Sequence, residues 1–123
     1  QQMQETFACP SVEAAGAAEE IASLYKESGY LMDPHTAVAY AAAKEQAKEN
    51  VCVVLSTASP YKFPGSVLKA VGQPVPQDEF EALKELEQFS KLPAPEALKN
   101  LQTMPVRFTQ TIEKEQILDV ARG

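Results

Sequence analysis

The sequence has few basic residues, few cysteines and no long apolar run. Eleven Lys and Arg stand against 17 Asp and Glu, which gives a formal net charge of -6. Because phosphate contacts need clustered Lys and Arg, this balance argues against binding nucleic acid or an anionic membrane. No apolar run approaches the roughly 20 residues that span a bilayer. We therefore expect neither a nucleic-acid partner nor a membrane partner.

Cysteine and histidine are too sparse to predict a metal or redox centre. Cys9 and Cys52 fit no metal-binding or redox spacing. His35 is the only histidine and lacks Cys or acidic partners at ligand spacing, so we expect no metal site. Cys52 lies in an apolar run, where we expect a buried, reduced thiol. Such a thiol favours a cytoplasmic location.

The beginning of the chain carries no secretion signal. Gln1–Glu5 has neither the basic start nor the apolar core of a signal peptide. The chain also does not begin with Met, so we expect its amino end to be a cut within a longer protein. Its 123 residues allow at most one domain.

Helical patterns cover most of the sequence. Ser11 is a candidate N-cap for a first helix that ends before Gly29, and Asp33-Pro34 predicts the start of a second. Asp78 caps a long helix with an apolar stripe. The predicted ranges are 11–28, 34–48, 64–70, 79–89, 95–101 and 114–121.

Two segments have strand character. The run Val51–Leu55 is apolar throughout and predicts a buried strand, while residues 106–112 give a weaker strand pattern. A strand that is apolar on both faces needs neighbouring strands and helical cover. We therefore expect an α/β fold with helices packed on one or two strands, as the C-terminal part of a larger α/β enzyme. Alone, such a piece exposes apolar surface, and we expect it to self-associate.

The loop that follows the first predicted strand, Ser56–Phe63, is rich in hydroxyl groups. Open α/β sheets bind ligands at the carboxyl ends of their strands, which makes Ser56 and Thr57 candidate site residues. The alternative is a purely structural role, in which these hydroxyls only form hydrogen bonds within a turn. A hydrolase nucleophile is disfavoured, since no flanking glycines form a nucleophile elbow.

Three segments together carry a family resemblance: Glu5–Ala8, Tyr25–Ala39 and Val54–Phe63. They resemble the C-terminal region of the threonine synthase family, within the tryptophan-synthase-β-like enzymes that use pyridoxal phosphate (PLP). The resemblance covers nearly the whole chain. It implies that residues 1–123 are the C-terminal portion of the three-layer α/β cofactor domain. It also implies a lyase of threonine biosynthesis that converts O-phosphohomoserine and water to threonine and phosphate.

The resemblance also implies roles for particular residues. Thr57 matches the threonine whose hydroxyl meets the pyridine nitrogen of the cofactor, and Ser56 competes for that role. Asp33 matches an acid near the cofactor ring, although an N-cap explains it equally well. Lys62 is a candidate for binding the phosphate or carboxylate of the small-molecule substrate. His35 is a second candidate for binding substrate, with a purely structural role as the alternative.

The chain departs from the family pattern in three respects. Ser59 stands where the family commonly has histidine. No lysine has the sequence context of the family's Schiff-base lysine, and the five glycines form no phosphate-binding loop. Because a lysine imine makes the cofactor reactive, we expect this chain alone to be inactive.

Two alternatives to a threonine synthase stay open at this stage. One is another PLP lyase of the same fold that acts on a different amino acid. The other is a non-catalytic interaction module with acidic, amphipathic helices. The second rests on the stripe from Phe80 to Phe89, which needs a partner.

Overall fold

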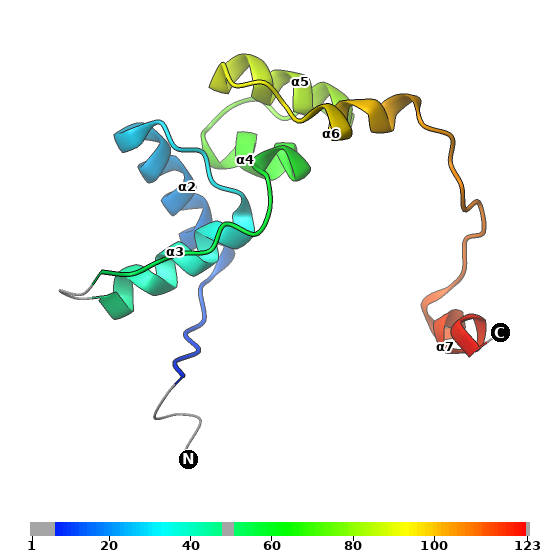
Figure 1. Cartoon of the computed structure of the whole chain (residues 1–123), viewed down its shortest axis with the longest axis horizontal. Helices are drawn as coiled ribbons and strands as arrows, with labels where there is room; N and C mark the ends of the chain where they lie inside the picture. Colours follow the sequence, from blue (N-terminus) through cyan, green and yellow to red (C-terminus); the bar gives the residue numbers. More distant parts are fainter. Residues whose placement is uncertain (1–6, 48–50, 123) are drawn as a thin grey trace.

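The computed structural model describes residues 7–47 and 51–122, and the regular elements within them are helices (Figure 1). The α-helices are α2 (Ala14–Ser28), α3 (Pro34–Ala47), α4 (Pro64–Ala70), α5 (Glu79–Ser90), α6 (Glu96–Asn100) and α7 (Ile117–Arg122). Three 3₁₀ turns join them: η1 (Pro60–Lys62), η2 (Leu101–Thr103) and η3 (Lys114–Gln116).

The prediction of an α/β fold is wrong, because the described residues contain no strand. In the predicted strand 51–55, the side chains of Val51, Val53 and Leu55 are 95%, 85% and 75% exposed. Cys52 is exposed as well, contrary to prediction. A strand forms only when a neighbour pairs with its backbone, and no segment of the described chain does so here. The weaker strand candidate, 106–112, is irregular for the same reason.

Most helix boundaries follow the predicted capping signals. Gly29 ends α2 with φ of 74°, and its N–H donates to the Tyr25 carbonyl at 2.8 Å. The Asp78 side chain accepts hydrogen bonds from the first amides of α5. The start of α2 differs from prediction: the helix begins after Glu13, not at Ser11, and Glu13 makes no side-chain cap. Lys48, the predicted end of the second helix, lies outside the described residues.

The core lies where α2, α4 and α5 meet the segment that joins α2 to α3. Its largest fully buried side chains include Ile21, Met32, Leu68 and Leu86. The α2 helix packs on α3 and α4, and α4 packs on α5. Burial of one such aliphatic side chain contributes about 1.5–3 kcal/mol to folding. This apolar contact holds the N-terminal helices and α5 together.

The apolar stripe of α5 faces this core. Leu83 and Leu86 are buried, and the ring of Phe89 lies 5.2 Å from that of Tyr25. The stripe therefore has an intramolecular partner, so it no longer supports the idea of an interaction module.

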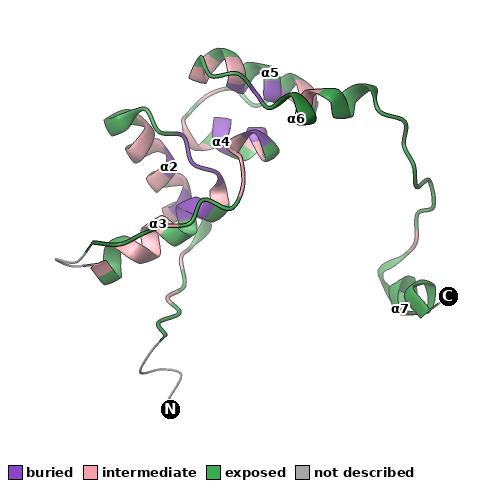
Figure 2. Ribbon diagram, in the orientation of Figure 1, coloured by how far each residue is buried: buried purple, intermediate pink, exposed green. Residues whose placement is uncertain are grey.

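Residues 104–122 form a C-terminal arm that runs away from the helical body (Figures 1 and 2). Its large apolar side chains, such as Val106, Phe108 and Leu118, are exposed. The chain exposes 9804 Å² in total, whereas a compact monomer of 13.4 kDa exposes about 6,500 Å². The fold thus leaves much more surface uncovered than a self-sufficient domain of this size.

Replacing Leu86 by Ala tests the position of the core. We expect Leu86→Ala to lower the free energy of unfolding by about 2–5 kcal/mol, because the lost methyl groups leave a cavity. The same replacement at Leu118, on the exposed α7, should change it by no more than about 0.5 kcal/mol. Urea unfolding followed by circular dichroism measures both. Equal losses at the two positions would contradict the described core.

Candidate functional site

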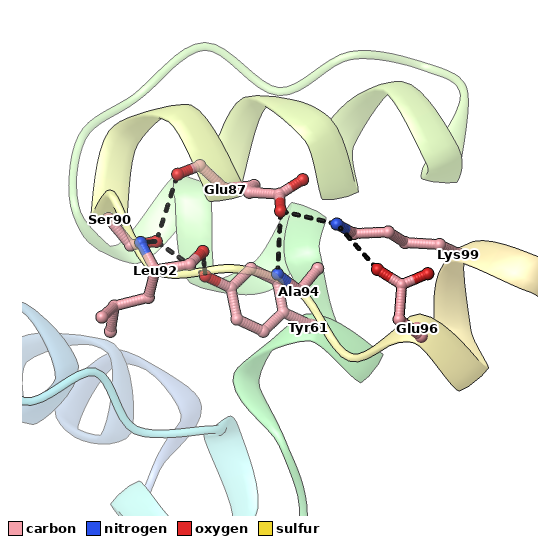
Figure 3. Close-up of polar contacts among 7 residues, drawn as sticks. All are labelled: Tyr61, Glu87, Ser90, Leu92, Ala94, Glu96 and Lys99. Atoms are coloured by element: carbon pink, nitrogen blue, oxygen red, sulfur yellow. Dashed lines mark hydrogen bonds and ion pairs between the residues drawn. The ribbon is translucent and has the colours of Figure 1, made fainter.

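The Ser56–Phe63 loop is fastened to α5 at Tyr61. The Tyr61 ring is buried, its hydroxyl donates to the Leu92 carbonyl at 2.6 Å, and the Ser90 hydroxyl lies 2.7 Å away (Figure 3). At the turn before it, the Ser59 side chain accepts from the Tyr61 amide at 3.3 Å. These contacts fix the end of the loop that carries the predicted site residues.

The segment after α5 is held in place by Glu87. Its carboxylate accepts hydrogen bonds from the Ala94 amide at 3.1 Å and from Lys99 Nζ at 2.8 Å (Figure 3). The hydrogen bond from Lys99, with that from Ala94, lowers the pKa of Glu87 below its usual value. This contact keeps the segment beside the loop, where Leu92, Pro93 and Pro95 line a cavity together with loop residues.

Asp33 is fully buried at the start of α3 and caps this helix, as predicted. Its Oδ1 accepts from the His35 amide at 2.9 Å and from the Thr36 amide at 3.4 Å, and Oδ2 accepts from the Thr36 hydroxyl. Burial alone raises the pKa of Asp33. The hydrogen bonds from Thr36 and His35 together outweigh it and hold the pKa below the usual value of 3.8. Asp33 is therefore ionised at neutral pH.

The Asp33 carboxylate also sets the tautomer of His35. The His35 ring atom Nδ1 lies 3.0 Å from Asp33 Oδ1. Since an ionised carboxylate only accepts hydrogen bonds, Nδ1 carries a proton and Nε2 is the atom left free for other partners. The ring lies 4.8 Å from that of Phe63, and the His35 side chain is 62% exposed. His35 is thus oriented from two sides and still reachable by a ligand.

The structure distinguishes the two predicted hydroxyls. Ser56 Oγ lies 3.4 Å from the hydroxyl oxygen of buried Thr36 and borders an open cavity of about 520 Å³. Tyr30 and Tyr61 also line this cavity. Thr57 is exposed, does not line it, and makes no side-chain hydrogen bond to the described residues. Ser56 is the hydroxyl that the fold positions.

Lys62 lies on a neighbouring face. It lines an open cavity of about 400 Å³ together with Lys69, Ser66 and Glu79. Its Nζ lies 6.0 Å from the ring of Phe63, the side chain that contacts His35. The structure therefore gathers Asp33, His35 and Ser56 into one cluster, with Lys62 beside it and Thr57 apart.

Sequence reasoning missed Thr36, which joins α3 to the loop. One signal was available, because Thr36 occupies the third helical position after the Asp33 cap. A polar side chain there can exchange hydrogen bonds with the capping residue. Its contact with Ser56, 20 residues along the chain, has no such local signal.

The pH dependence of stability tests the role of Asp33. Its pKa is lower in the folded chain than in the unfolded one, so its carboxylate stabilises the fold fully above pH 3.8. This contribution is lost as the pH falls through the folded-state pKa.

We expect the free energy of unfolding to drop below about pH 4, and to drop less steeply in Asp33→Asn. At neutral pH, Asp33→Asn should cost about 1–3 kcal/mol, since its amide cannot accept every hydrogen bond. Asp119→Asn removes the same charge from the exposed α7 and controls for net charge. Urea unfolding from pH 2.5 to 7 measures the three profiles. Parallel profiles for the original chain and Asp33→Asn would exclude the described hydrogen bonding.

Membrane-spanning helices and metal-binding clusters are both absent from residues 7–47 and 51–122. None of the described helices is both long and apolar enough to cross a bilayer. In the same residues, His, Cys, Asp and Glu side chains form no group of three that could hold a metal ion.

Comparison with known proteins identifies the family. Residues 36–121 match the family model described as threonine synthase, C-terminal. The chain is 48% identical over 58 residues to the threonine synthase of Pseudomonas aeruginosa, which covers 45% of this chain and 12% of that protein. It is 38% identical over 77 residues to threonine synthase-like 1 of Mus musculus, covering 61% of this chain and 10% of the relative.

The chain thus spans only about a tenth of the length of these curated relatives. The family match itself extends over most of the chain: it begins at Thr36, in the first turn of α3, and includes the Ser56–Phe63 loop. The sequence resemblance is confirmed: the chain belongs to the threonine synthase family and corresponds to its C-terminal part.

Proposed function

We propose that this chain is the C-terminal segment of a PLP-dependent threonine synthase. The complete enzyme would convert O-phospho-L-homoserine and water to L-threonine and phosphate, in the cytoplasm, as a lyase of threonine biosynthesis. The observation that carries this proposal is the family match over residues 36–121. The match contains Thr36, Ser56 and Lys62, whereas Asp33 and His35 lie directly before it.

The residues of this chain fit one part of the cofactor. A hydroxyl at Ser56 and the tyrosine side chains at the edge of the same cavity suit a flat aromatic ring with a polar nitrogen. No lysine lines this cavity within the described chain. We therefore propose that this segment meets the ring and that another part of the enzyme supplies the imine-forming lysine. Bound PLP supplies the electron sink of the reaction.

The remaining cluster residues are proposed to act on the substrate side. Lys62 and Lys69 line one cavity, and a pair of ammonium groups suits the phosphate or the carboxylate of the substrate. His35 offers Nε2 to a polar group of the substrate. Asp33 is buried with both oxygens occupied, so we propose that it acts through His35 and Thr36, not by direct contact.

The same proposal accounts for the exposed apolar surface of the chain. Exposed apolar side chains at Val51, Val53 and Leu55 and along the C-terminal arm would be covered by the rest of the enzyme. The isolated chain would instead self-associate through them.

A second candidate is a related PLP lyase with a different amino-acid substrate. It is favoured by the relative named threonine synthase-like 1, whose name differs from that of the enzyme although 77 residues match at 38% identity. The substrate tested below separates the two.

The proposed reaction is tested with the complete enzyme and with residues 1–123 alone. We expect the purified complete protein to be yellow and to release phosphate from O-phosphohomoserine, measured by a colorimetric phosphate assay. The chain alone should be colourless and inert, because it lacks the imine-forming lysine. A yellow protein that releases no phosphate would favour the second candidate. A colourless, inactive complete protein would contradict both candidate functions.

The choice between the two hydroxyls is tested by a pair of variants in the complete enzyme. We expect Ser56→Ala to shift the absorbance maximum of the bound cofactor and to lower kcat about tenfold or more, since the ring loses its hydroxyl contact. Thr57→Val removes a neighbouring hydroxyl that the fold does not position, and should leave both near their original values. The reverse result would assign the contact to Thr57, as the family resemblance implies.

A further inference from the structure

Three connecting segments, distant from one another in the sequence, line the cavity of about 520 Å³. They contribute residues from 29–31, 56–61 and 92–95. All three lie outside the α-helices, so no helical hydrogen-bond ladder fixes their spacing. The shape of the cavity therefore depends on the tertiary contacts that join these segments.

The side chain of Tyr61 joins the Ser56–Phe63 loop to residues 92–95. Its ring is 6% exposed, and its hydroxyl donates to the Leu92 carbonyl at 2.6 Å and lies 2.7 Å from Ser90 Oγ (Figure 3). Among the described residues, no other hydrogen bond connects this loop with α5 or with the segment after it. In this part of the chain, Tyr61 is therefore the polar link between two walls of the cavity.

Residues 92–95 are in turn held by α5. The two prolines of this segment have no N–H, which leaves the amides of Leu92 and Ala94 as its backbone donors. The Leu92 amide donates to Ser90 Oγ at 3.2 Å. The Ala94 amide donates to the Glu87 carboxylate at 3.1 Å. Both donors are thus taken by side chains of one helix, so this wall has a fixed place on α5.

We propose that Tyr61 is a positioning residue for the ligand of this cavity. Its hydroxyl holds the loop that carries Ser56 against the wall that α5 keeps in place. Leu92, Pro93 and the exposed ring of Tyr30 give the cavity apolar surfaces, which suit a planar ring. Naming this ring as the pyridine of PLP rests on the proposed function, whereas the contacts of Tyr61 do not.

The first test measures cofactor binding in the complete enzyme. Tyr61→Phe keeps the ring and removes only the hydroxyl. We expect it to raise the dissociation constant of PLP about three- to tenfold, the range of one hydrogen bond, and to shift the absorbance maximum of the bound cofactor. Tyr25→Phe removes the same group from a tyrosine that packs on Phe89 and does not line this cavity. This control should change neither value.

Thermal unfolding of the same variants separates positioning from a purely structural role. If Tyr61→Phe lowers Tm but leaves both cofactor readouts unchanged, the proposal is overturned. A complete protein that binds no PLP at all would contradict the proposed function instead. The role of Tyr61 would then be decided by hydrogen exchange, which needs no ligand.

The second test measures hydrogen–deuterium exchange of the complete protein by mass spectrometry. We expect Tyr61→Phe to speed exchange in the peptides that cover residues 56–63 and 91–95, because the two walls are no longer joined. Tyr25→Phe should leave both peptides at their original rates. Unchanged exchange in Tyr61→Phe would contradict the proposed link between loop and wall.

A variant of Glu87 covers the case in which Tyr61→Phe does not fold. The Glu87 side chain is partly exposed, so Glu87→Gln should keep the fold while weakening the hold on the Ala94 amide. We expect faster exchange in residues 91–95 and a higher dissociation constant for PLP. Glu85→Gln removes the same charge from an exposed position of α5 and should change neither. Equal behaviour of the two variants would show that this wall does not shape the cavity, and the inference would fail.

Discussion

The buried carboxylate of Asp33 is the interaction on which the candidate site depends. It caps α3, fixes the tautomer of His35 and accepts the hydroxyl proton of Thr36. An unpaired carboxylate could not stay buried, because its desolvation would exceed the stability of a small domain. The network of donors around Asp33 is therefore required by its burial. The same network orients the His35 ring and includes the Thr36 hydroxyl that contacts Ser56.

The second constraint is the surface that the fold leaves uncovered. The helical body has a core around Ile21, Leu68 and Leu86, yet the apolar run 51–55 and the C-terminal arm contact little of it. The chain spans about a tenth of the length of its matched relatives. A segment of that length within a larger protein can leave its apolar side chains for other parts of the protein to cover. This accounts physically for a family member with so much exposed surface.

Family membership and the local cluster support the functional proposal in different ways. The match to the threonine synthase C-terminal model concerns most of the chain, whereas the cluster shows what a few side chains can do chemically. The cluster offers an oriented hydroxyl and an oriented imidazole, with two lysines lining a neighbouring cavity. These groups suit binding and orienting an anionic substrate and an aromatic ring.

The sequence by itself determined the features that depend on neighbours in the chain. Asp33-Pro34, Gly29 and Asp78 mark helix ends correctly because capping is a local interaction. The order and spacing of short motifs along the chain identified the family. Only the tertiary structure decided what depends on distant partners. The apolar run 51–55 reads as a strand, yet a strand needs a pairing neighbour that the described chain does not supply. Thr36 and Ser56 are in contact although they lie 20 residues apart in the chain. This contact distinguishes Ser56 from Thr57 as the hydroxyl that the fold holds, and no local sequence pattern predicts it.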